Sequence, residues 1–270
     1  MFSMNAGHFE ECAPIPHRYV SPAEVRVLKW GSGGVSDTLY VSGDALLLAR
    51  PAVALIGSRS ASVEGVTLAG SVARELVALG YVVLSGLAAG VDAAAHRSAM
   101  AAGGRTIAVI GTPLERVYPL QNAGLQEQVY KEHLLVSPFS PGTATRRWHF
   151  PARNRLMARL ATATVLVEAA EASGTVHQVR EGLALGRPVL VARRIAETVG
   201  WVREFVCAGR CTDSHRRRGD LHHGGGRRRN RRLPVPPVAS EWLDGHLKAI
   251  IWPCPSTART AFTCSFRMTN

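Results

Sequence analysis

The stretch VALIGSRSAS, residues Val53–Ser62, decides how the rest of this sequence is interpreted. A short apolar run comes first, then Gly57-Ser58-Arg59, and then a segment with helical periodicity. Such a strand–loop–helix junction brings backbone N–H groups, a hydroxyl and a guanidinium to one point, which suits a phosphate. The sequence therefore predicts an α/β protein that handles a phosphate-bearing molecule.

The same alternation of strand and helix recurs as far as residue 191. Continuous apolar, β-branched strands indicate burial on both faces, so the expected fold is α/β, a mostly parallel sheet with helices on both faces. The expected strands are 52–56, 81–84, 106–110, 134–136, 164–168 and 189–191, with helices at 63–79, 93–102, 123–131, 153–160 and 176–185.

Composition divides the chain into three parts. Residues 1–50 are expected to form an N-terminal arm and edge strand, 51–206 the main domain, and 207–270 a disordered tail rich in Arg, Gly and Pro. The formal net charge is +12, but residues 1–204 hold 20 of the 32 Lys+Arg and 16 of the 20 Asp+Glu, so most of the excess is in the tail. The abrupt change in composition has two explanations, a disordered tail or a shifted reading frame.

Several protein classes do not fit this composition. No run of about 18 apolar residues is present, and the first 20 residues lack the apolar core of a signal peptide. The five cysteines are odd in number and absent from the strand–helix region, which argues against a disulfide framework. We therefore expect a cytoplasmic protein with reduced thiols and no membrane contact.

Four loops at the carboxyl ends of the expected strands are rich in glycine and hydroxyl side chains. Ligands of open α/β sheets gather outside these strand ends, and small residues let a backbone approach an anion. The alternative is that the small residues merely form tight turns. The candidate phosphate-binding residues in these loops are Gly57, Ser58, Arg59, Ser85, Gly86, Gly90, Gly111, Thr112, Ser173, Gly174 and Thr175.

The segment RRWHFPARNR, residues Arg146–Arg155, interleaves arginines with aromatic residues. This pattern suits single-stranded nucleic acid, because arginines pair with phosphates while rings stack on bases. The alternative is a solvated charged loop with one buried tryptophan. The candidates for DNA binding here are Phe150, Arg153, Asn154 and Arg155.

Neither a catalytic constellation nor a cofactor motif emerges from the sequence. Asp92 is expected to cap a helix, and a hydrogen bond from His96 one turn later is plausible. Cys207 and Cys211, with three histidines downstream, have no standard metal-site spacing, so no metal is expected. A Walker P-loop is also absent from the sequence.

Taken together, the motifs resemble the DNA-processing protein A (DprA/Smf) family. The resemblance implies an extended Rossmann-like domain that dimerises, binds single-stranded DNA without enzymatic activity and helps load a RecA-type recombinase in natural transformation. It also implies that Arg59, Phe150, Arg153, Asn154 and Arg155 line the DNA pocket. The matching segments are LYVSGD (Leu39–Asp44), VALIGSR (Val53–Arg59), SGLAAGVDAAAH (Ser85–His96), GTPLERVYPLQN (Gly111–Asn122), FPARNR (Phe150–Arg155) and SGTVHQ with ALGRPV downstream (Ser173–Val189).

Two other functions remain open at this point. One is a nucleotide-processing hydrolase of the Rossmann-like lysine-decarboxylase-like superfamily, in which Ser173-Gly174-Thr175 would hold phosphate and Glu168 or Glu181 would act as the acid. The other is a nucleotide-sensing module, which would bind a mononucleotide more tightly than an oligonucleotide.

Overall fold

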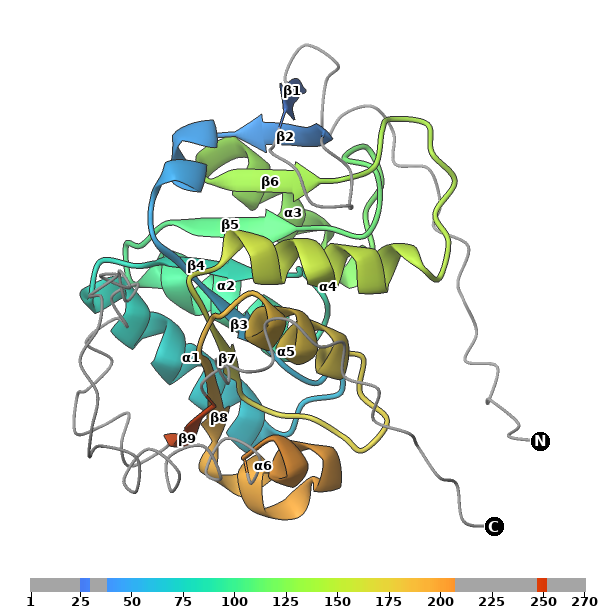
Figure 1. Cartoon of the computed structure of the whole chain (residues 1–270). Coiled ribbons are helices and arrows are strands. Elements are labelled where there is room, and N and C mark those ends of the chain that lie inside the picture. The colour runs from blue at the N-terminus through green and yellow to red at the C-terminus, as the bar shows by residue number, and fades with distance from the viewer. Residues whose placement is uncertain (1–24, 30–37, 207–246, 252–270) are drawn as a thin grey trace, which may run out of the picture.

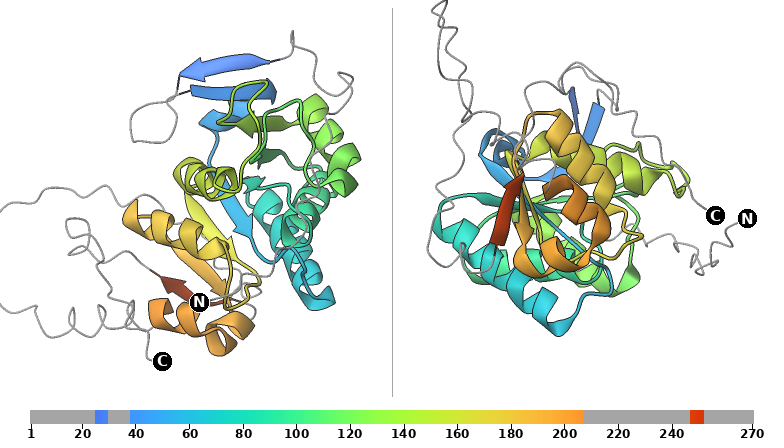
Figure 2. Two further views of the ribbon diagram at one scale, coloured as in Figure 1. Left: turned by 90° about the vertical axis from the view of Figure 1, so that its right-hand side faces the viewer. Right: turned by 60° about the horizontal axis from the view of Figure 1, so that its bottom comes forward.

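A single twisted sheet with helices on both faces organises the chain (Figures 1 and 2). The computed structural model describes residues 25–29, 38–206 and 247–251. Within them, nine strands follow the order β1-β2-β6-β5-β4-β3-β7-β8-β9. The expected α/β class and mostly parallel sheet are confirmed.

Six strands in the middle of the sheet run parallel to one another. They are buried along their whole length, as the unbroken apolar runs predict, because helices cover both of their faces. The register is regular, with Val53 opposite both Val83 and Ala163. These strands are β3 (Ala52–Ile56), β4 (Val82–Ser85), β5 (Thr106–Val109), β6 (Leu134–Ser137), β7 (Ala163–Leu166) and β8 (Val189–Ala192).

Helices form two layers, which the edge-on view in Figure 2 separates. On one face lie α1 (Val63–Ala78), α2 (Val91–Ala101) and α3 (Ala123–Glu132), packed on strand residues such as Leu55 and Val83. On the other face lie α4 (His149–Leu160) and α5 (Thr175–Ala184), packed on the alternate strand residues, such as Ala54 and Leu84. Each layer therefore buries one side of the same strands.

Antiparallel strands close both edges of the sheet. At one edge β1 (Arg26–Lys29) pairs with β2 (Thr38–Gly43), which pairs with β6. At the other edge β9 (Leu247–Ile251) pairs with β8. The short elements are η2 (Ala45–Ala49), η3 (Leu120–Asn122) and α6 (Arg193–Thr198).

Three features depart clearly from the sequence expectations, while the bounds of the other expected elements agree to within two residues. Helix α4 begins at His149 rather than at Arg153, because Pro151 occupies its first turn, where no backbone N–H is needed. Neither α6 nor β9 was predicted, although β9 falls within the expected tail. The rest of that tail, the arginine clusters and all five cysteines lie outside the described residues, and the three-part division of the chain stays a prediction.

Candidate nucleic-acid interface

The candidate site lies at the carboxyl ends of the parallel strands, next to the point where the order of strand addition reverses. Strands β3 to β6 add in succession toward one edge, and the chain then crosses back to place β7 on the other side of β3. Loops leaving β3 and β7 therefore diverge at this point, which is where open α/β sheets bind ligands. The β3 loop, Gly57-Ser58-Arg59, stands beside it.

The first two glycine-rich loops are joined through their backbones. Gly90 has φ +72°, and a Cβ there would lie 2.3 Å from the carbonyl oxygen of Ser58. The Val91 N–H donates to the same oxygen at 3.2 Å. Position 90 therefore requires glycine, both because of its positive φ and because a side chain would collide with Ser58. The contact fixes the position of the loop that carries Arg59.

Arg59 and Phe150 form the exposed centre of the site. The guanidinium carbon of exposed Arg59 lies 5.2 Å from the centroid of the Phe150 ring, a cation–π distance. Tyr118 also packs on Phe150, with the two ring centroids 5.2 Å apart and the rings tilted by 52°. Gly111 permits this packing, since a Cβ there would lie 2.8 Å from Phe150 Cδ1.

Helix α4 connects this centre to the loop after β7. Phe150 and Asn154 are four residues apart and so share a helix face. The side-chain N–H of Asn154 donates to the carbonyl oxygen of Gly174 at 3.2 Å, and the hydroxyls of Ser173 and Thr175 lie 2.8 Å apart. We call Arg59, Tyr118, Phe150, Asn154 and Gly174 the rim site. Arg155, the next residue of α4, is half-buried.

Arg153 is buried beneath the rim site, contrary to the expectation that it meets phosphate. Its Nη1 donates to the carbonyl oxygens of Gly86 and, at 3.0 Å, of Val109. Burial lowers the pKa of Arg153 to about 10, opposed by the carboxylate of Asp92. Both side chains approach Gly86, where a Cβ would collide with them. Arg153 therefore holds the β4 and β5 loops from inside.

Two predicted hydroxyl donors also point inward. The Ser85 hydroxyl donates to the carbonyl oxygen of Leu55 at 2.6 Å, and the Thr112 hydroxyl donates to that of Arg116 at 2.9 Å. Both residues are buried. Their hydroxyls stabilise loop geometry, and any contact with an anion at these loops would have to come from backbone groups.

The β4–α2 loop depends on residues that the sequence analysis did not single out as supports. Leu87 is buried with φ 59°, a left-handed conformation that is uncommon for a non-glycine residue. Buried Asn122 donates to the carbonyl oxygens of Leu87 at 2.9 Å and Ala88 at 3.1 Å. Asp92 accepts from the Ala88 N–H at 3.3 Å, a bond to the loop before the helix. The N-cap of α2 is Gly90 and no side chain caps this helix, so the expected capping role of Asp92 is wrong.

The N-terminus of α1 is already occupied by a side chain of the protein. The carboxylate of Glu168 accepts from the Ser62 N–H at 3.1 Å and from the Ser62 hydroxyl at 2.5 Å. The Ser62 hydroxyl in turn accepts from the Gly65 N–H at 3.0 Å. The sequence predicted that this helix start would present N–H groups to a phosphate. That prediction is wrong for α1, and the candidate surface shifts to Arg59 and α4.

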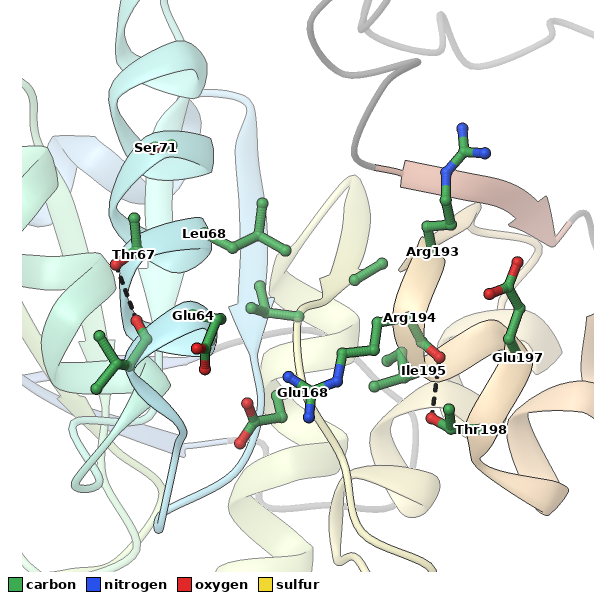
Figure 3. Close-up of a pocket in the computed structure, with 14 residues that line it drawn as sticks. Glu64, Thr67, Leu68, Ser71, Glu168, Arg193, Arg194, Ile195, Glu197 and Thr198 are labelled. Atoms are coloured by element: carbon green, nitrogen blue, oxygen red, sulfur yellow. Dashed lines mark hydrogen bonds between the residues drawn. The ribbon is translucent and has the colours of Figure 1, made fainter.

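A cavity of about 630 Å³ opens on the far side of Glu168, between α1 and α6 (Figure 3). Its walls include apolar Leu68 and Ile195, and Arg194 extends toward Glu64 and Glu168 in the view. Hydrogen bonds to its own backbone N–H and to Ser62 lower the pKa of Glu64, with a smaller contribution from Arg194. Three carboxylates, those of Glu64, Glu168 and Glu197, outnumber the two arginines of the lining, Arg193 and Arg194, so the cavity has no excess positive charge for the phosphates of a polyanion.

The residues considered for catalysis are engaged elsewhere. Glu181 forms an ion pair with Arg159 at 3.1 Å. His96 Nδ1 lies 2.6 Å from the Thr106 hydroxyl, and its Nε2 has no partner among the described residues. The expected hydrogen bond between His96 and Asp92 is therefore wrong. Within 25–29, 38–206 and 247–251 no group of three His, Cys, Asp or Glu residues could hold a metal. The Cys207 group considered above lies outside those ranges.

The family model described as DNA recombination-mediator protein A matches residues 32–207. The chain belongs to this family. DNA processing protein DprA of Streptococcus pneumoniae is 41% identical over 153 residues, which are 56% of this chain and 53% of that protein. DprA of Bacillus subtilis is 34% identical over 152 residues, 56% and 51% of the two chains. The chain thus spans about half the length of these curated relatives.

Solved structures of DNA recombination-mediator family proteins share the fold. The Streptococcus pneumoniae DprA structure superposes with a TM-score of 0.55 at 40% identity, covering 57% of this chain and 54% of that chain. DNA processing protein A of Helicobacter pylori, described for its unique single-stranded DNA binding mode, gives 0.56 at 28% identity, with 62% and 80% covered. The resemblance inferred from the sequence motifs is confirmed. Among the helices of the described residues, none is long and apolar enough to cross a membrane.

Proposed function

We propose that this chain binds single-stranded DNA at the rim site and acts as a non-enzymatic DNA-processing protein. The observation that carries the proposal is the contact between exposed Arg59 and the ring of Phe150, 5.2 Å apart at the carboxyl edge of the sheet. A guanidinium beside a half-exposed ring offers a phosphate partner and a stacking surface together, which is what recognition of an unpaired strand needs.

Local charge supports a polyanion at this edge. Arg59 and Arg153 act electrostatically on buried Asp92, so two guanidinium groups stand against one carboxylate. Burial raises the pKa of Asp92, and the two arginines oppose this shift. Of the two arginines, Arg59 is the exposed one, so its guanidinium is the group that a phosphate would meet. The backbone of Gly57-Ser58 and the Ser173–Thr175 loop complete the proposed contact surface, with Arg155 beside it.

Membership of the DNA recombination-mediator family extends the proposal to partners. The relatives named DNA processing protein, and the single-stranded DNA binding described for the Helicobacter pylori protein, support DNA as the ligand. We further propose a cytoplasmic homodimer that protects incoming DNA and helps load a RecA-type recombinase in natural transformation. In this proposal residues 51–206 are the DNA-binding domain, 1–50 the arm and edge strand, and 207–270 a tail rich in Arg, Gly and Pro.

The hydrolase alternative has weaker support. Glu168 is bound to Ser62 at the start of α1, and Glu181 is paired with Arg159, so neither carboxylate is placed to protonate a leaving group beside Ser173–Thr175. A mononucleotide site at the start of α1 would have to displace the Glu168 carboxylate. The nucleotide-sensing alternative meets the same obstacle.

Binding of different nucleic acids tests the proposal. Fluorescence anisotropy with labelled oligothymidylate, the corresponding duplex and a labelled nucleoside monophosphate should rank the single strand first, with affinity falling as salt rises. Chromatography of the mixture with unlabelled nucleoside monophosphates should detect no released base. Preference for the mononucleotide, or release of free base, would replace the proposal by one of its alternatives.

A further inference from the structure

Trp148 presents a large aromatic side chain beside the rim site. It is 58% exposed, and it is the only aromatic among the exposed large hydrophobic residues of the ranges that the structure describes. It is the N-cap residue of α4, two positions before Phe150. The sequence left open a buried tryptophan in this loop, and the exposure of Trp148 removes that alternative.

Buried aromatic neighbours hold Trp148 in place. Its ring meets His149 edge-on with centroids 4.3 Å apart, and Phe139 in the same manner at 5.7 Å. Phe139 and His149 are buried and stack on each other at 3.8 Å with an interplanar angle of 11°. The His149 N–H donates to the Arg146 carbonyl oxygen at 3.0 Å, which closes the turn. An aromatic platform fixed in this way loses little conformational entropy when a ligand binds.

The charge around Trp148 favours a polyanion. Arg146 and Arg147 precede it and are exposed, and the first turn of α4 contains no acidic residue. A helix N-terminus carries a partial positive charge that attracts phosphate. A strand whose base meets Phe150 would therefore find a second ring and a favourable potential nearby, because Trp148 lies two residues before Phe150 at the start of α4.

We propose that Trp148 is a second stacking platform, which takes an unpaired base of the same single strand that the rim site binds. This inference rests on the proposed function. The added contact is aromatic and uncharged, so its effect on affinity should not depend on salt as the effect of Arg59 does. Loss of the indole should weaken binding without changing the number of phosphates neutralised.

Titration of labelled oligothymidylate at several salt concentrations tests this assignment with the full-length chain. Trp148→Ala should weaken binding about 5- to 100-fold with an unchanged salt slope, and Trp148→Phe should recover most of the affinity. Trp201→Phe is the matched control, because Trp201 is not part of the rim site and its indole N–H donates to the Ala170 carbonyl oxygen at 3.1 Å. Urea unfolding of Trp148→Ala checks that the variant is folded, because the basic residues of an unfolded chain would still neutralise phosphates and keep a salt slope.

Intrinsic fluorescence provides a second readout. Five tryptophans contribute to the emission, and a stacked indole is quenched by the bound base. Oligothymidylate should quench wild type and Trp201→Phe strongly and Trp148→Phe much less. Undiminished quenching in Trp148→Phe, or Trp148→Ala binding within twofold of wild type, overturns the inference and leaves the proposed function standing. Absence of oligothymidylate binding by wild type overturns both.

Discussion

The guanidinium of Arg59 lies over the ring of Phe150, 5.2 Å from its centroid. Arg59 follows β3, whereas Phe150 belongs to the first turn of α4, so the contact joins two distant segments at one edge of the sheet. The ring shields one side of the guanidinium and leaves the other to solvent. Charge and aromatic surface are thereby presented to a ligand in a fixed relative orientation.

Phe150 should contribute to DNA affinity through its ring alone. Phe150→Ala is expected to weaken oligothymidylate binding about 5- to 100-fold without changing the salt slope, because stacking neutralises no phosphate. Phe150→Tyr keeps the ring and should bind nearly as wild type. Titration by fluorescence anisotropy measures both variants, and equal affinity of Phe150→Ala and wild type would exclude Phe150 from the interface.

Arg153 should be required for stability rather than for direct contact. Arg153→Ala removes the donor to the Gly86 and Val109 carbonyl oxygens and leaves Asp92 without its buried counter-charge. Leaving a buried polar group without its partner costs about 1–3 kcal/mol of unfolding free energy. Urea unfolding measures this, with exposed Arg146→Ala as the matched control. A stable Arg153→Ala protein with a smaller salt slope would instead restore the phosphate contact predicted from the sequence.

Gly65 and Glu168 should be energetically coupled. A Cβ at Gly65 would lie 2.3 Å from Glu168 Oε2, so Gly65→Ala should displace the carboxylate from the start of α1. Loss of such a cap costs about 0.5–2 kcal/mol. In a Glu168→Ala background the clash is gone, and Gly65→Ala should stabilise α1 by up to about 1 kcal/mol through helix propensity. A double-mutant cycle by urea unfolding tests this change of sign, and additive effects would contradict it.

His96 should make the fold sensitive to acid. Burial, followed by the charges of His133 and Arg153, lowers the pKa of His96 to about 3 from its ordinary value of 6.5. The Thr106 hydroxyl donates to the Val83 carbonyl oxygen and so accepts from His96 Nδ1, while Nε2 has no partner among the described residues. The folded protein therefore has no acceptor ready for a second imidazole proton.

The direction of the pH effect follows from this shift. The unfolded chain takes up the proton first, so stability is complete above pH 6.5 and falls as the pH drops toward 3. The loss from this group is up to about 1.4 kcal/mol per pH unit. Urea unfolding between pH 7 and 5 should show a shallower dependence for His96→Asn than for wild type. Identical slopes would assign the acid sensitivity to other groups.

Much of the fold could be predicted because the parallel strands are buried on both faces. Runs such as Ala52–Ile56 consist of apolar residues only, which predicts burial on both faces, and β3 has the expected bounds. The start of α4 was less predictable, because Pro151 is compatible both with a turn and with the first turn of a helix. Strand β9 depends on pairing with β8, a long-range contact that no local pattern reports.

The site was predicted at the level of loops but not of side-chain direction. Arg59 and Phe150 were both selected, yet their contact arises only from the order of the strands. Arg153 has the same local sequence context whether it points to solvent or to buried Asp92, and packing under Gly86 decides the matter. Tyr118 and Glu168 act through partners far along the chain, on Phe150 and Ser62. Tyr118 lies in the Gly111–Asn122 segment that was already singled out, but nothing local indicates the contact of Glu168.

The salt dependence of single-strand binding by Arg59→Ala and Arg50→Ala tests the central claim most directly. Both arginines are exposed and flank β3, Arg59 after its carboxyl end and Arg50 before its amino end. The two variants therefore lose the same charge at opposite ends of the parallel strands. We predict that Arg59→Ala weakens oligothymidylate binding and lowers the slope of log affinity against log salt by about 1, while Arg50→Ala leaves both unchanged. Equal effects of the two substitutions, or none from Arg59→Ala, would contradict binding at the rim site.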